Sequence, residues 1–87
     1  MKVLSVDQIT RRESPLLYRT TYDALATLAG GDEQTLQVPI EFVVESDPFG
    51  RKSVTVKLIE DVNEPTLPII QELAAQIESL RTEGALP

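Results

Sequence analysis

Two runs of alternating apolar and polar residues, joined by a turn sequence, constrain the fold of this chain more than any other feature. Residues 35–45 read TLQVPIEFVVE and residues 52–61 read KSVTVKLIED. Apolar side chains at every second position are typical of a half-buried β-strand. The segment Asp47–Gly50 between them suits a type I turn followed by a bulge. The pattern predicts a β-hairpin over Thr35–Asp61, in which Pro39, lacking an N–H, faces an edge or a bulge.

The C-terminal segment has the period of an α-helix. Its apolar residues recur at i, i+3, i+4, i+7 and i+10, which places them on one stripe: Ile70, Leu73, Ala74, Ile77 and Leu80. Thr66 is the predicted N-cap, Pro68 falls in the first turn, and Gly84 is placed to end the helix. We expect a helix over Leu67–Thr82 whose stripe packs on one face of the sheet. That face is predicted to consist of Val38, Ile40, Phe42, Val54, Val56 and Leu58.

The segment Leu17–Ala29 fits either a strand or a helix. Its first half is rich in Tyr and Thr, which favour a strand, whereas its second half is rich in Ala and Leu, which favour a helix. The reversal sequence Gly30–Glu33 decides for the strand. Lys2–Val6 is predicted to be a further short strand, with a helical turn over Val6–Arg11 as the alternative.

Together these elements predict an α+β fold: an antiparallel three- to four-stranded β-meander with one C-terminal α-helix packed on one face. The chain has 87 residues, which fits a single domain over residues 1–87. The element order is similar to that of the double-stranded-RNA-binding domain, although the resemblance carries no motif. Those domains have a basic cluster entering the last helix, where this chain has Asp61, Asn63 and Glu64.

Composition limits the chemistry that the chain can perform. It contains neither cysteine nor histidine, so thiolate nucleophiles and the usual proton-transfer and transition-metal side chains are missing. The sequence also has no glycine-rich phosphate loop. Glu41 with Glu45, and Glu60 with Asp61 and Glu64, are interpreted as surface and helix-end charges. We therefore predict a non-enzymatic protein with no cofactor and no metal.

The hairpin tip holds the residues most suggestive of a partner site: Phe49, Arg51 and Lys52. Exposed aromatic side chains beside cations are enriched in protein interfaces. The alternative, which the sequence favours, is that Phe49 folds back over the edge of the core. The most suitable function is a protein-interaction or regulatory module. The rival is a nucleic-acid-binding domain, whose local basic face would consist of Arg11, Arg12, Arg19, Arg51 and Lys52.

Charge and patterning also bear on partners and location. The net charge is −6, from 8 basic and 14 acidic residues, which makes nucleic acid an unfavourable partner. The N-terminal apolar stretch is too short for a signal peptide, and no segment reaches membrane-spanning length, so a cytoplasmic location without membrane contact is expected. One helix covers only one face of a sheet, and we expect a homodimer through a sheet edge or through the uncovered face. The apolar residues of that face would be Val43, Ile59 and Leu25.

Overall fold

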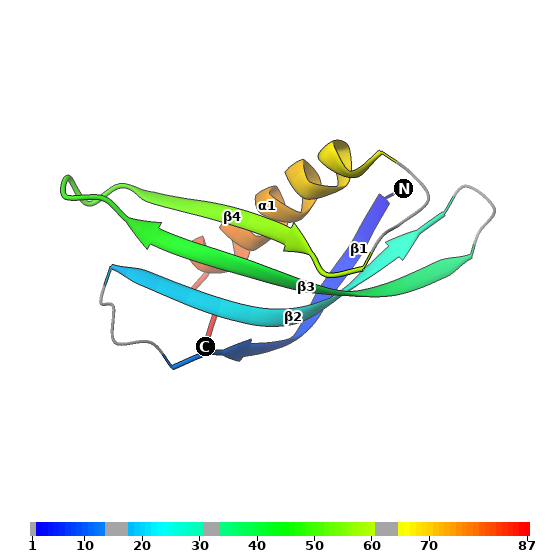
Figure 1. Ribbon diagram of the computed structural model, residues 1–87, viewed down its shortest axis with the longest axis horizontal. Helices are drawn as coiled ribbons and strands as arrows, with labels where there is room; N and C mark the ends of the chain where they lie inside the picture. Colours follow the sequence, from blue (N-terminus) through cyan, green and yellow to red (C-terminus); the bar gives the residue numbers. More distant parts are fainter. Residues whose placement is uncertain (1, 14–17, 31–33, 61–64) are drawn as a thin grey trace.

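The computed structural model describes residues 2–13, 18–30, 34–60 and 65–87. Four strands form one antiparallel sheet in the order β1-β2-β3-β4, and a helix follows them (Figure 1). The strands are β1 (Lys2–Arg11), β2 (Arg19–Ala29), β3 (Thr35–Ser46) and β4 (Lys52–Leu58), and the helix is α1 (Thr66–Thr82). The predicted α+β meander with one C-terminal helix is confirmed.

β2 is a strand, as the sequence analysis preferred, and the helical alternative for this segment is wrong. Tyr22, Ala24, Ala26 and Leu28 are buried at every second position, which is the period of a strand with one face on a core. β2 pairs with β3 without interruption from Arg19 to Ala29. The glycine-rich reversal that decided the prediction, residues 30–33, lies outside the described residues except for Gly30.

β1 is twice as long as predicted, and its second half is strand where a helical turn was the alternative. The apolar residues Val3, Val6 and Ile9 are spaced by three, so a regular strand would send them to alternate faces. The pairing of β1 with β2 shifts between Val3 and Ser5 and again between Asp7 and Thr10. These two bulges let Val3, Val6 and Ile9 all pack against the core.

The core lies between the sheet and α1, which packs on the far side of the sheet in the view of Figure 1. Its centre is Phe42 in β3, which stacks on Tyr22 of β2 with ring centroids 4.9 Å apart. The six residues predicted for this face all lie in it: Val38, Ile40, Phe42 and Val56 are buried, and Val54 and Leu58 are half-buried. Burying aromatic and aliphatic surface in this way is the main favourable contribution to folding.

α1 differs from the prediction at its start. Pro65 occupies the N-cap and Thr66 is the first helical residue, so the predicted N-cap is displaced by one position. The fully buried residues are Ile69, Leu73 and Ile77, spaced by four. The sequence analysis missed Ile69, and Ile70 is only half-buried at the flank of the stripe. Gly84, with φ of 72°, follows the helix end as expected.

The other face of the sheet carries no helix. Val43 lies on it, opposite Thr21 of β2 and Thr55 of β4, and it is nevertheless buried. Its position in a central strand, between neighbours on both sides, accounts for this burial. Ile59 lies just beyond β4 and is exposed, and Leu25 is half-buried. The apolar surface expected on this face is therefore smaller than the sequence suggests.

Candidate interaction surface at the hairpin end

The turn between β3 and β4 is held by a set of hydrogen bonds centred on Asp47. One carboxylate oxygen of Asp47 accepts from the backbone N–H of Phe49 at 2.9 Å and from that of Arg51 at 2.8 Å. The backbone N–H of Gly50 donates to the Asp47 carbonyl at 3.0 Å, and the N–H of Asp47 donates to the Arg51 carbonyl at 2.8 Å. Gly50 has φ of 82°, a conformation that favours glycine. The tip is thus a fixed turn.

This turn directs Phe49 into solvent. Its side chain is 88% exposed, the most of any large hydrophobic residue described. The favoured interpretation from the sequence, that Phe49 folds back over the core, is therefore wrong. The physical reason is the length of the hairpin, which projects beyond α1 at the left of Figure 1, so that no core lies beneath the tip.

A second aromatic residue and a proline lie at the same end of the sheet. The carbonyl of Tyr18 accepts a hydrogen bond of 2.8 Å from the N–H of Ser46, the last residue of β3. Tyr18 and Pro48 line one shallow depression together with Glu45, Ser46 and Asp47. Tyr18 is also more than half exposed. Tyr18, Pro48, Phe49, Arg51 and Lys52 are called the hairpin surface below.

The two cations of the hairpin surface are exposed, and neither makes an ion pair with any described residue. Lys52 also borders a cavity of about 250 Å³ between the end of the sheet and the segment after α1. Arg81, at the rim of this cavity, is engaged by Glu78 one turn earlier on the helix, with 3.0 Å between its Nε and the Glu78 carboxylate. This contact raises the pKa of Arg81 and lowers that of Glu78.

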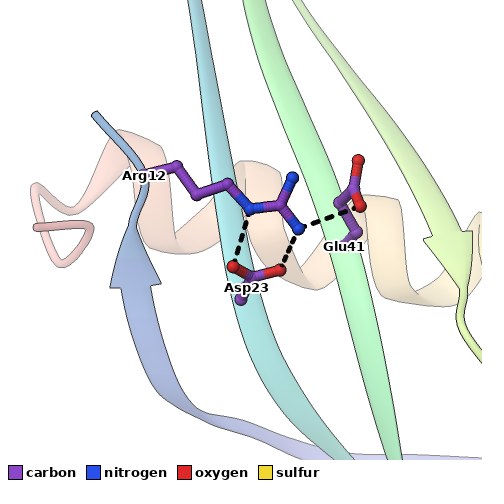
Figure 2. Close-up of polar contacts among 3 residues, drawn as sticks. All are labelled: Arg12, Asp23 and Glu41. Atoms are coloured by element: carbon purple, nitrogen blue, oxygen red, sulfur yellow. Dashed lines mark hydrogen bonds and ion pairs between the residues drawn. The ribbon is translucent and has the colours of Figure 1, made fainter. Parts of the chain in front are cut away.

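The other three arginines of the predicted basic face do not join Arg51 and Lys52 as free cations. Arg12 donates through Nε and Nη2 to the Asp23 carboxylate at 2.8 and 2.5 Å, and through Nη2 to Glu41 at 3.1 Å (Figure 2). Arg19 lies 3.9 Å from the Glu45 carboxylate. Arg11 is exposed at the end of β1. The sequence analysis did not find the three-residue contact, because it depends on the strand register.

The contact of Arg12 solves a problem that the register creates. Asp23 and Glu41 face each other directly across β2 and β3, and like charges opposite one another destabilise a sheet. The Arg12 guanidinium reaches both carboxylates and offsets their repulsion. Its hydrogen bond holds the pKa of Asp23 below the usual value, and hydrogen bonds to Asp23 and Glu41 raise the pKa of Arg12 itself.

Arg12→Met is therefore expected to destabilise the protein more at pH 7 than in acid. Because the pKa of Asp23 is lowered on folding, its stabilising effect is present above the ordinary value of 3.8 and is lost as the pH falls through the folded value. Urea unfolding at about pH 7 and about pH 2.5, the latter well below the ordinary carboxyl range, measures the difference. Arg11→Met, the adjacent exposed arginine, should show no such pH dependence. Equal pH profiles for the two variants would contradict this account.

Two further classes of site were considered in the described part of the chain. No three acidic side chains there gather closely enough to hold a metal ion. Of the predicted acidic group at the end of β4, Asp61 and Glu64 lie outside the described residues. None of the described helices is long and apolar enough to cross a membrane.

The fold and the hairpin surface define an antiparallel meander with one helix and a projecting aromatic tip. Residues 1–82 match the model of the BB_0187 family, and the chain belongs to this family. The description of the family names no activity. No curated protein and no solved structure matches the chain.

Proposed function

We propose that this protein is a small non-enzymatic interaction module, and that the hairpin surface is its contact site for another protein. The observation that carries the proposal is the exposure of Phe49 on a fixed turn. An aromatic side chain in water gains free energy when a partner buries it, by roughly 25 cal/mol per Å² of apolar surface. Such residues provide much of the binding energy in protein interfaces.

The turn geometry favours binding in a second way. Asp47 fixes the backbone on both sides of Phe49 through the two hydrogen bonds described above. A partner therefore does not have to order the loop, and less conformational entropy is lost on association. Arg51 and Lys52 beside the aromatic ring favour a partner with an apolar pocket and an acidic rim.

A photo-crosslinking amino acid in place of Phe49 tests the proposal in cells that express the full chain. We expect it to capture a protein partner, and the capture to be lost when Arg51 and Lys52 are both changed to Glu. The same probe in place of Leu36 is the matched control, because Leu36 is also an exposed apolar residue of the hairpin but lies at the other end of β3. Equal products from the two positions would count against a specific site.

Nucleic-acid binding is the outcome that would replace this proposal. The rival face includes Arg12 and Arg19, which are paired with acidic residues. Titration with mixed nucleic acid at low and high salt separates the two functions. Salt-sensitive binding that is lost on Arg51→Ala/Lys52→Ala would favour the rival.

A further inference from the structure

The sheet has two edge strands, and their outer backbone groups differ in what they contact. In an antiparallel sheet each residue directs its N–H and C=O to the same side, so alternate residues of an edge strand point outward. Outward groups that stay unpaired are a template for another strand. The two edges here are β1 and β4.

The β1 edge is blocked by α1 and by its own irregularity. The outward N–H of Val3 donates to the Glu72 carboxylate at 3.1 Å, and its carbonyl accepts from the Gln76 side chain at 3.3 Å. Both bulges of the sheet lie in this strand, and Gln8 has φ of 53°. Bulges and covered backbone groups are devices that prevent edge-to-edge pairing.

The β4 edge is regular and open. β4 pairs with β3 without any shift in register from Lys52 to Leu58. The hydrogen bonds from Asp47 to Arg51 (2.8 Å) and from Ile59 to Pro39 (3.2 Å) fix the odd-numbered residues as those that bond to β3. The even-numbered residues therefore point outward, and no described residue bonds to these outward groups: Lys52, Val54, Val56 and Leu58.

We propose that β4 pairs antiparallel with β4 of a second copy of this chain, about a two-fold axis at Thr55. This inference deepens the proposed function by naming one partner, and it uses β4 rather than Phe49. In this register Val54 faces Val56 of the second copy and Lys52 faces Leu58 of the second copy. All four outward residues then exchange hydrogen bonds with outward residues. Thr55 faces its own copy, and β-branched and threonine pairs of this kind stabilise sheets.

Charge complementarity favours this register. β4 carries Lys52 and Lys57 and no acidic residue, whereas Glu41 and Glu45 lie in β3. With the axis at Thr55, Lys57 stands opposite the neutral Ser53 of the second copy, and Glu45 of that copy lies one strand further. An axis at Val54 would place Lys57 opposite Arg51 of the second copy, and like charges there are unfavourable.

Pairing of this kind has a functional consequence. The two β4 strands run in opposite directions, so the two hairpin tips lie at opposite ends of one continuous sheet. The dimer would display two Phe49 side chains. Two linked contact sites raise the overall affinity for a partner with repeated binding sites, because the second contact becomes intramolecular.

Single cysteines test the register, since the chain has no cysteine of its own. In Thr55→Cys the two thiols would face each other in a non-hydrogen-bonded pair, with Cα atoms about 4.5 Å apart, within reach of a disulfide. In Ser53→Cys, the matched control on the same face, they would be roughly 13 Å apart. Under mild oxidation we expect Thr55→Cys to form covalent dimer roughly tenfold faster or more, because pairing raises the effective thiol concentration. Equal rates, or faster linking of Ser53→Cys, would overturn the proposal.

Sedimentation across a concentration series measures the association itself. We expect the mass to rise from 9.6 kDa toward twice that value, and Val54→Pro to keep it at 9.6 kDa. The N–H that proline removes points away from β3, so the hairpin is expected to persist, which circular dichroism checks. A wild-type mass fixed at 9.6 kDa up to high concentration would disprove the dimer. Such a result would leave the hairpin surface untouched, because partner capture at Phe49 is measured separately.

Discussion

Phe42→Ala is expected to lower the free energy of unfolding by about 3–5 kcal/mol. Phe42 is fully buried at the centre of β3 and stacks on Tyr22. Its removal loses the transfer free energy of the ring and leaves a cavity that the surrounding strands fill only in part. The total stability of a small domain lies near the low end of about 5–15 kcal/mol. The variant is therefore expected to be largely unfolded, which urea denaturation followed by circular dichroism measures.

Phe49→Ala is the matched control, because it makes the same chemical change at an exposed site. Surface substitutions of this kind usually change stability by less than about 0.5 kcal/mol. The two phenylalanines of the chain thus separate core packing from surface display. If Phe49→Ala destabilised the protein as much as Phe42→Ala, the tip would have to be packed in solution, and the described exposure of Phe49 would be wrong.

The second large effect concerns the contact of α1 with the sheet. Leu73 is fully buried in the middle of α1, and Leu73→Ala is expected to cost about 2–5 kcal/mol. Urea unfolding of Ile69→Ala and Ile70→Ala tests which face of the helix is buried. Ile69 is buried and Ile70 is only half-buried, so the first change should be the more costly. The reverse order would restore the stripe expected from the sequence and contradict the described orientation of α1.

The hairpin, β2 and the helix could be predicted because their signals are local. In β3 and β4 the period of two coincides with burial on one face, and the turn residues stand between the strands. For α1 the spacing of apolar residues fixes the element, yet not its rotation to within one residue. Ile69 and Ile70 are adjacent and chemically identical, so only packing against the sheet distinguishes them.

β1 could not be predicted in full because its sequence has the wrong period for a strand. Val3, Val6 and Ile9 recur every three residues, and two bulges are needed to bring them to one face. The bulges depend on pairing with β2, which is not a local property. The spacing of three in a segment rich in β-branched residues is the only sign of it in the sequence.

The candidate site was located from the sequence only in part. Phe49, Arg51 and Lys52 were identified by residue type and by their place in a turn, but the outward direction of Phe49 follows from the length of the hairpin beyond α1. The contact among Arg12, Asp23 and Glu41 joins three strands. It requires the register, which alternation alone leaves open between strands.

Titration of the purified partner captured at position 49 tests the central claim most directly. Isothermal titration calorimetry would compare the wild-type chain with Phe49→Ala and with Leu36→Ala as the control. We predict that Phe49→Ala weakens binding by about 2 kcal/mol or more, which is roughly thirtyfold in Kd, whereas Leu36→Ala leaves Kd unchanged. A Phe49→Ala protein that binds the partner as tightly as the wild type would contradict the claim that the hairpin surface is the contact site.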